Sequence, residues 1–189
     1  MSVPTAEKKR LWTYEELAAE LPETNRLTEL WDGELVMPPS PTPLHQEIVA
    51  RLARALGDFV SRRHLGWVYF APLDVVLTER RVVQPDILYV SQAKRAIIQD
   101  QIRGVPDLII EVVSAGSWRQ DRIDKKALYE QFSVTEYWIV DPEAQTIEVY
   151  ALEQGAYRLI GRFQPGEQAR SQLLPGFEIA VDEVVKGAS

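Results

Sequence analysis

The strongest pattern of apolar and polar positions in the chain lies between Pro43 and about Arg63. Apolar side chains recur there at every third or fourth position, which places them along one side of an α-helix. Thr42 is suited to cap this helix with its side-chain oxygen, and Pro43 suits the first helical position. The segment therefore predicts a long amphipathic helix. Its buried stripe is expected to consist of Ile48, Val49, Leu52, Leu56, Phe59 and Val60.

Two shorter signals precede the long helix. Thr13 and Glu16 have the spacing of a capping box, which predicts a short helix through residues 14–21. Asp32-Gly33 separates two strand-like runs and is a strong signal for a tight β-hairpin. A proline-rich connection then leads into the long helix. We therefore expect a helix and a hairpin in the N-terminal part of the chain.

Runs rich in β-branched and aromatic residues follow the long helix and predict strands. A polar segment at residues 91–104 separates two of these runs and is expected to be partly helical, and residues 118–132 are expected to form a helix. The core strands are expected at residues 67–71, 73–78, 85–90, 106–114 and 136–142, with further candidates at 146–152, 157–163 and 177–181.

The order of the core elements is helix, three strands, helix, strand (αβββαβ). The connection between the strands at 106–114 and 136–142 is long enough for a right-handed crossover between parallel strands. This order indicates an α/β fold in which a mixed β-sheet is flanked by helices. Because the length is within the usual range and no repeat is present, residues 1–189 are expected to form a single domain.

Composition narrows the class of protein. Hydrophobic residues make up 46% of the chain, and no apolar run is long enough for a transmembrane helix. We expect a cytoplasmic protein without membrane association, since no secretory signal is visible. The lack of cysteine excludes disulfides and thiolate metal sites. The net charge of −7 is unfavourable for a protein that simply coats nucleic acid, but it is compatible with an enzyme whose metal site is acidic.

The first candidate for chemistry is Glu111, which lies in the middle of an apolar strand. A buried carboxylate is costly without a partner. Asp107 shares its face of the strand but lies about 13 Å away, which is too far for the two acids to hold one ion. Asp86 begins the preceding predicted strand, and neighbouring strands lie about 4.8 Å apart. Asp86 and Glu111 are therefore expected to bind one divalent cation through oxygen ligands.

The helix expected after Glu111 adds a positive charge. Asp121, Lys125 and Tyr129 are four residues apart, so they form one stripe, and Lys126 points about 100° away from it. If the stripe faces the sheet, Lys125 is placed to stabilise charge on a phosphate or to position a water. Each residue taken alone is commonly structural, and Asp121 with Lys125 could be an ordinary surface pair. The combination with two acids on strands favours a site.

Residues 85–90, 105–114 and 136–142 read "PDILYV", "VPDLIIEVVS" and "EYWIVDP". In this order the motifs resemble the Uma-two family of restriction-endonuclease-like proteins, which belongs to the PD-(D/E)xK nuclease superfamily. The resemblance extends over about residues 11–180. It implies a restriction-endonuclease-like fold, with DNA as the substrate and Mg²⁺ or Mn²⁺ as the cofactor.

The superfamily pattern is an Asp after a Pro on one strand and an acid–x–Lys on the next. Asp86 matches the first acid and Glu111 the second, but Val113 stands at the place of the lysine. Valine carries no charge, so the site is either inactive or takes a lysine from elsewhere. The resemblance implies that Lys125 is this lysine.

Three residues near the N-terminus are less well defined by pattern. The resemblance implies that Glu34 is a further catalytic residue, with Glu29 as its rival. The two lie on either side of the hairpin turn, so strand alternation does not distinguish them. His45 is expected to be an exposed residue of the first helical turn, and Gln84 to lie beside the site.

These observations lead to one principal hypothesis. The protein is expected to be a metal-dependent endonuclease that hydrolyses phosphodiester bonds in DNA. Asp86 and Glu111, with the carbonyl of Val112, would bind the metal, and Lys125 would orient or activate water. Local basic groups would contact DNA, although a basic residue of this kind is more often a plain surface residue than a phosphate contact. These basic groups are Arg62, Arg63, Arg80, Arg81, Arg119 and Arg122.

The alternative hypothesis is a non-catalytic homodimeric binding module that keeps the nuclease fold. Val113 and the acidic balance favour it. A homodimer is expected in either case, through the apolar strands at 146–152 and 157–163. No organic cofactor is expected, because no glycine-rich phosphate loop follows a strand. A zinc hydrolase is unfavourable because the two histidines lack ligand spacing.

Overall fold

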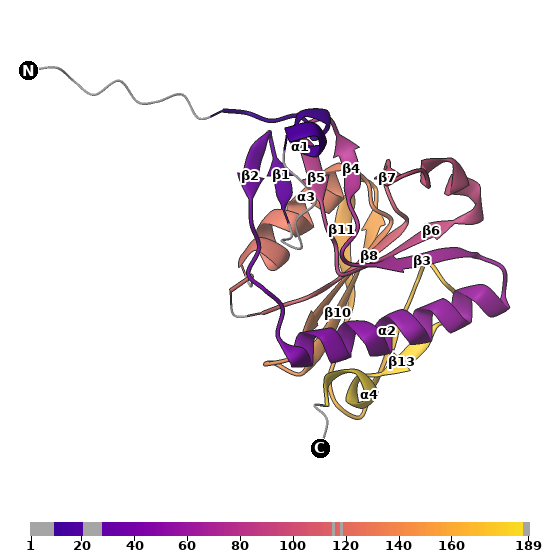
Figure 1. Ribbon diagram of the computed structural model, residues 1–189. Helices are drawn as coiled ribbons and strands as arrows, with labels where there is room; N and C mark the ends of the chain where they lie inside the picture. The colour runs from indigo at the N-terminus through magenta and orange to yellow at the C-terminus, as the bar shows by residue number, and fades with distance from the viewer. Residues whose placement is uncertain (1–9, 21–27, 115, 118, 187–189) are drawn as a thin grey trace, which may run out of the picture.

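The computed structural model describes residues 10–20, 28–114, 116–117 and 119–186 (Figure 1). Its helical elements are α1 (Tyr14–Glu20), α2 (Pro43–Arg62), the 3₁₀ turn η1 (Gln92–Ile97), the π-helical turn η2 (Gln120–Lys125), α3 (Lys126–Gln131) and α4 (Val181–Val185). Its strands are β1 (Glu29–Trp31), β2 (Glu34–Val36), β3 (Gly66–Phe70), β4 (Val75–Thr78), β5 (Arg81–Val83), β6 (Ile87–Ser91), β7 (Ile102–Arg103), β8 (Leu108–Val112), β9 (Glu136–Asp141), β10 (Thr146–Glu153), β11 (Ala156–Phe163), β12 (Gln168–Arg170) and β13 (Glu178–Ala180).

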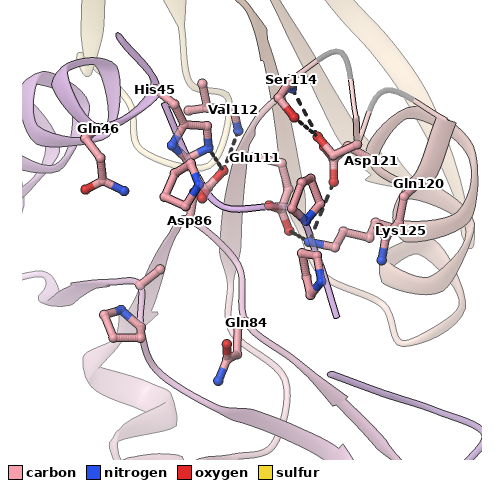
Figure 2. Close-up of a pocket in the computed structure, with 16 residues that line it drawn as sticks. His45, Gln46, Gln84, Asp86, Glu111, Val112, Ser114, Gln120, Asp121 and Lys125 are labelled. Atoms are coloured by element: carbon pink, nitrogen blue, oxygen red, sulfur yellow. Dashed lines mark hydrogen bonds and ion pairs between the residues drawn. The ribbon is translucent and has the colours of Figure 1, made fainter. Parts of the chain in front are cut away.

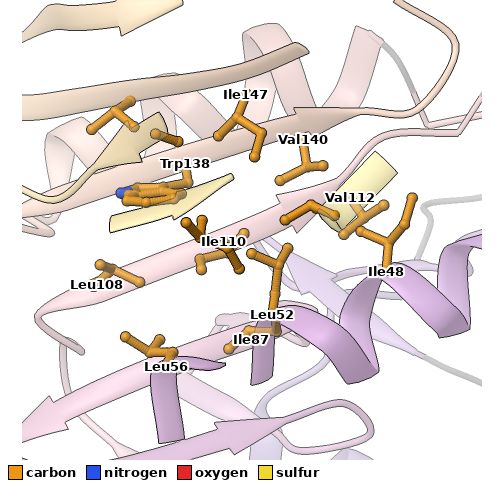
Figure 3. Packing of buried hydrophobic residues seen from close by; sticks show 14 of the residues in the cluster. Ile48, Leu52, Leu56, Ile87, Leu108, Ile110, Val112, Trp138, Val140 and Ile147 are labelled. Atoms are coloured by element: carbon orange, nitrogen blue, oxygen red, sulfur yellow. The ribbon is translucent and has the colours of Figure 1, made fainter. Parts of the chain in front are cut away.

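Helix α2 forms as the apolar pattern predicts. The Thr42 Oγ1 accepts a hydrogen bond from the backbone N–H of His45 at 3.2 Å, which caps the helix. Ile48, Leu52 and Leu56 of the expected stripe are fully buried against β6, β8 and β9 (Figure 3). Burial of each such side chain contributes about 1.5–3 kcal/mol. Packing against the sheet thus fixes the helix axis, and with it the position of the first helical turn.

The central sheet has the strand order β11-β10-β9-β8-β6-β3. β8 and β9 are parallel, with Leu108 opposite Glu136, while the other neighbouring strands are antiparallel. η2 and α3 form the crossover between the two parallel strands. The elements α2, β3, β6, β8, α3 and β9 therefore have the predicted order of helix, three strands, helix and strand.

One expected strand lies elsewhere. The run at residues 73–78 forms β4, which pairs with β5 and β7 in a second sheet of order β2-β1-β5-β4-β7, here called the hairpin sheet. Pro72, between β3 and β4, has no N–H to donate to a sheet ladder. The chain leaves the central sheet at this point and returns to it with β6. The run at 73–78, expected among the core strands, therefore forms a strand outside the central sheet.

The predicted N-terminal hairpin and helix are confirmed. Asp32 and Gly33 have φ angles of 53° and 85°, as a two-residue type I′ turn requires, and they connect β1 to β2. The backbone N–H of Thr13 donates to Glu16 Oε2 at 2.8 Å, and that of Glu16 donates to Thr13 Oγ1 at 3.3 Å, which completes the capping box. β1 pairs with β2 on one side and β5 on the other, so Glu29 lies inside the hairpin sheet.

Strand β8 separates two hydrophobic clusters. Ile110 and Val112 face the cluster that α2 covers, whereas Ile109 and Val113 face the cluster under α3. This alternation is the one that the sequence predicts. Glu111 consequently points toward the α3 side of the sheet.

The C-terminal part of the chain forms the β10–β11 hairpin, the small β12–β13 ladder and α4. The strands expected at 146–152 and 157–163 are confirmed, whereas the run at 177–181 is a strand only to Ala180 because α4 begins at Val181. Within the described residues, no helix has the length and hydropathy to cross a bilayer.

Candidate active site

A cavity of about 230 Å³ opens between the start of α2, the proline-rich connection, β8 and η2 (Figure 2). Asp86, Glu111 and Lys125 all line it, together with His45 and Asp121. The structure thus brings together the three residues that the sequence analysis placed at the centre of a site.

The pairing of β6 with β8 explains how the two acids meet. The strands are antiparallel, with Ile87 opposite Ile110. Extending this register by one residue places Asp86, immediately before β6, opposite Glu111. The two carboxyl groups therefore come from the same level of adjacent strands.

Glu111 is 2% exposed and has two hydrogen-bonding partners from the crossover. Its Oε1 accepts from Lys125 Nζ at 3.0 Å and from the hydroxyl of Tyr129 at 2.7 Å. Burial raises the pKa of Glu111 well above its usual value, the ammonium of Lys125 opposes this rise, and the charges of Asp86 and Asp121 add to it. Glu111 is thus a buried acid held by one cation among other acids.

Lys125 lies at the centre of a group of carboxylates. Its Nζ is 3.0 Å from Glu111 Oε1, 3.3 Å from Glu29 Oε1 and 3.6 Å from Asp121 Oδ1. Burial lowers the pKa of Lys125, but these carboxylates outweigh burial and raise the pKa well above its ordinary value. The side chain is therefore held as a charged ammonium.

The stripe of Asp121, Lys125 and Tyr129 faces the sheet, as the sequence analysis expected. The backbone differs from the expected continuous helix, because residues 120–125 form a π-helical turn before α3 begins at Lys126. Such turns often occur at functional sites. The side chain of Lys126 points elsewhere and lies over the ring of Tyr150.

Glu29 contacts Lys125 at 3.3 Å, although neither Glu29 nor Glu34 is among the residues that line the cavity. Glu29 is 0% exposed and accepts hydrogen bonds from the backbone of Gln84 and the side chain of Gln120, both at 3.1 Å. Glu34 lies on the outermost strand of the hairpin sheet. Of the two rivals, Glu29 is the one that contacts Lys125, and the catalytic role that the resemblance implies for Glu34 stays a prediction.

His45 differs from the expected exposed residue. Its side chain is only 12% exposed, and Nε2 lies 3.2 Å from Oδ2 of Asp86. The same Asp86 oxygen accepts the backbone N–H of Val112 at 2.7 Å. Burial lowers the pKa of His45, but the hydrogen bond and charge of Asp86 raise it by more, so the net shift is upward. The orientation of α2 over the cavity is what brings His45 inward.

Two further expectations concern the rim of the site. Gln84 lines the cavity, as expected, and its side chain donates to Asp74 at 2.6 Å. Arg122, one of the basic residues considered for DNA contact, instead pairs with Asp141 at 2.9 Å and with Glu148 at 3.0 Å. Arg122 is thus committed to an internal ion-pair network.

The donor atoms at the cavity fit a hard divalent cation that keeps part of its water shell. Among the described residues, no three His, Asp or Glu side chains are arranged to hold a metal by themselves. Mg²⁺, however, is usually bound through one or two carboxylates together with waters and phosphate oxygens. In the described part of the chain, Asp86 is hydrogen bonded through Oδ2 and Glu111 through Oε1. The second oxygen of each acid is therefore left for a ligand.

A mixed sheet with this crossover, and with two acids and a lysine at its centre, is characteristic of restriction-endonuclease-like proteins. The chain belongs to the Uma2 family, described as "Putative restriction endonuclease", whose model matches residues 13–182. The resemblance seen in the sequence is confirmed by this match.

A solved structure supports the fold. The chain is similar, with a TM-score of 0.75, to the crystal structure of a "putative nuclease belonging to DUF820" from Anabaena variabilis. The two sequences are 18% identical, and the alignment covers 92% of this chain and 97% of the other. The expected restriction-endonuclease-like fold is therefore confirmed. Comparison with curated proteins gave no match.

Proposed function

We propose that the protein is a metal-dependent endonuclease that hydrolyses phosphodiester bonds in DNA. The observation that carries this proposal is the 3.0 Å contact between Nζ of Lys125 and Oε1 of Glu111, in a cavity that Asp86 also lines. Two acids from adjacent strands and a lysine from the following helical segment thus lie together. Membership of a restriction-endonuclease family supports the same chemistry.

The acids supply the metal-binding part of the site. Asp86 and Glu111 would hold Mg²⁺ or Mn²⁺, with the backbone carbonyl of Val112 as a further ligand, because these cations prefer oxygen ligands. When bound, such an ion polarises the phosphate and offsets charge on the leaving oxygen. Three carboxylates that line the cavity, a fourth that contacts Lys125, and the lysine itself leave an excess of negative charge there, which favours a cation. The carboxylates are Glu29, Asp86, Glu111 and Asp121.

Lys125 would take the role that the usual lysine has in this superfamily. The residue at the usual place, Val113, is buried in the cluster beneath α3 and has no charge. Because its raised pKa keeps Lys125 protonated, Lys125 would donate a hydrogen bond to the attacking water or to a phosphate oxygen rather than remove a proton. Glu29 and Tyr129 would keep this arrangement rigid through their contacts with Lys125 and Glu111.

Nicking of supercoiled plasmid DNA in the presence of Mn²⁺ tests the proposal. Asp86→Asn, Glu111→Gln and Lys125→Met are each expected to reduce the nicking rate by about 10²-fold or more, as loss of charge stabilisation does in other enzymes. Lys126→Met is the matched control, because Lys126 adjoins Lys125 and lies over Tyr150 instead of the cavity. Unchanged nicking by the Lys125 variant, once folding is verified by circular dichroism, would contradict the proposal.

The second candidate is a non-catalytic homodimeric binding module. Val113 and the net charge of −7 favour it. The edge strand β11 carries Leu159 with its side chain exposed, which supports an association through this edge. Calorimetry separates the two functions. Mn²⁺ binding that Asp86→Ala abolishes, without cleavage of any form of DNA, would favour the binding module.

A further inference from the structure

An apolar groove of about 310 Å³ runs between α2 and β3, beside the candidate active site. On the helix side it is lined by the small residues Ala50, Ala53 and Gly57, and on the strand side by Val68 and Phe70. Small side chains facing an aromatic ring leave room for a flat group. The shape and apolar lining of the groove thus suit a planar ligand.

The groove is continuous with the cavity. Gln46 lines both spaces, and Figure 2 shows its side chain on α2 beside the cavity. Phe70 is followed by Ala71, which lines the cavity and donates its backbone N–H to the carbonyl oxygen of Asp86 at 3.0 Å. A chain molecule bound at Asp86 can therefore place its adjoining unit in the groove.

The groove also has the chemistry of a nucleotide site. Phe70 is 59% exposed, an unusual state for a phenylalanine at the edge of a packed sheet. Arg54 lies on the rim and is exposed, and it forms no ion pair with any residue that the structure describes. An aromatic face for stacking and a free cation for a phosphate are the two elements of single-strand nucleic-acid sites.

We propose that this groove binds an unpaired nucleobase next to the phosphate to be cleaved, stacked on Phe70, with the amide of Gln46 in reach of the base edge. This inference rests on the proposed nuclease function and specifies its substrate class. Unstacking a base from intact duplex costs free energy. The preferred substrate is therefore DNA with an unpaired nucleotide at the cleavage position, such as a single strand or a bulge.

Fluorescence anisotropy with a labelled single-stranded 20-mer tests the inference in EDTA, where no hydrolysis is expected. Phe70→Ala should weaken binding by about fivefold or more, from the known contribution of base–aromatic stacking, and Phe70→Trp should restore it. Leu11→Ala is the matched control, since Leu11 is a large exposed apolar residue that lines neither the groove nor the cavity. A bulged duplex should bind more tightly than a matched duplex, and Phe70→Ala should remove this difference.

An abasic scan localises the contact. Replacing single nucleotides of the 20-mer by abasic sites should weaken binding at one position, and Phe70→Ala should make that position indifferent. Equal binding by wild type and Phe70→Ala, or no binding of single strands, overturns the inference. Conversion of a dimer to a monomer by Phe70→Ala, measured by light scattering, would assign the groove to a second copy and also overturn it.

Failure of this inference is distinguishable from failure of the nuclease proposal. Plasmid nicking that depends on Asp86, with unchanged single-strand binding by Phe70→Ala, supports the nuclease and rejects the stacking site. If single strands bind in a Phe70-dependent way but no DNA is nicked, the nuclease proposal is rejected. The groove would then bind a base that does not adjoin a cleaved phosphate.

Discussion

Nζ of Lys125 lies 3.3 Å from Oε1 of Glu29, and this contact joins the hairpin sheet to the crossover of the central sheet. Glu29 is fully buried in β1, and Lys125 ends the π-helical turn before α3. The candidate site is therefore assembled from both sheets, although the motifs of the superfamily lie only on the central one. The orientation of the lysine depends on an acid outside those motifs.

The first prediction compares Glu29 with Glu34. Glu29→Gln removes a charge that holds Lys125, so we expect a loss of about 1–3 kcal/mol in the free energy of unfolding and a lower nicking rate. Glu34→Gln should have a smaller effect on both, because Glu34 is only half-buried on the outermost strand of the hairpin sheet. Urea unfolding and plasmid nicking measure the two effects. A larger effect of the Glu34 substitution on nicking would favour Glu34 as the catalytic residue, as the resemblance implies.

The second prediction concerns the hydroxyl of Tyr129, which donates to Glu111 Oε1 at 2.7 Å. Tyr129→Phe should destabilise the fold by about 1.5–3 kcal/mol, because hydrogen bonds to charged groups have this magnitude. Tyr157→Phe is the matched control, since its hydroxyl donates to a neutral acceptor, the Val134 carbonyl, at 2.9 Å. Its cost should be about 0.5–1.5 kcal/mol. Equal costs in urea unfolding would indicate that Glu111 is not charged.

The third prediction uses the raised pKa of His45. A base whose pKa is higher in the folded state stabilises the fold below its unfolded pKa, about 6.5, and this contribution is lost as pH rises through the folded pKa. In EDTA, wild type should therefore lose stability relative to His45→Asn as pH rises from 6 to 8.5.

His64→Asn controls for the loss of an imidazole, because His64 is exposed and its positive φ of 54° is tolerated by asparagine. Urea unfolding at a series of pH values measures the difference between each variant and wild type. A constant difference for His45→Asn would argue against the ion pair with Asp86.

The fourth prediction concerns metal binding at one of two Pro-Asp pairs. Mn²⁺ at about 100 times its dissociation constant should stabilise the wild-type fold by about 2.7 kcal/mol, since it binds only the folded chain. Asp86→Asn should abolish this gain. Asp107→Asn is the matched control, because Asp107 bonds the Ser91 N–H at 2.7 Å and Lys94 at 3.0 Å instead of lining the cavity.

Thermal unfolding with and without Mn²⁺ measures how much the ion stabilises the wild type and each variant. Asp107→Asn is expected to lower the baseline stability because it weakens a half-buried ion pair, while the increment from Mn²⁺ should persist. Loss of the Mn²⁺ stabilisation in both variants would mean that Mn²⁺ binding depends on the integrity of the fold and not on Asp86 in particular.

Local pattern was sufficient to predict a large part of the fold. The cap at Thr42, the turn at Asp32-Gly33 and the alternation through Glu111 are all decided by neighbours in sequence, and the structure has them as predicted. The pairing of β6, which follows Asp86, with β8, which contains Glu111, was also accessible, because the two runs are consecutive among the predicted strands.

The rest depends on contacts between distant segments. Nothing near β4 in the sequence indicates that it pairs in parallel with β7, and so the hairpin sheet was not foreseen. Glu29 and Glu34 are equivalent by strand alternation, and they differ only because β1 lies between β2 and β5, whereas β2 is the outermost strand. His45 was misplaced for the same reason, since its exposure is set by the angle at which α2 crosses the sheet.

One oxygen of Asp86, Oδ2, is hydrogen bonded to both the Val112 N–H and His45. Val112 belongs to a strand and His45 to a helix. The torsion angles of Asp86 are consequently restricted before any ligand arrives. The conformational entropy of this carboxylate is lost during folding and not during binding. The side chain is therefore already oriented for an incoming ion. Loss of either hydrogen bond to Asp86 should then slow binding of the ion more than it changes the number of ligands around the ion.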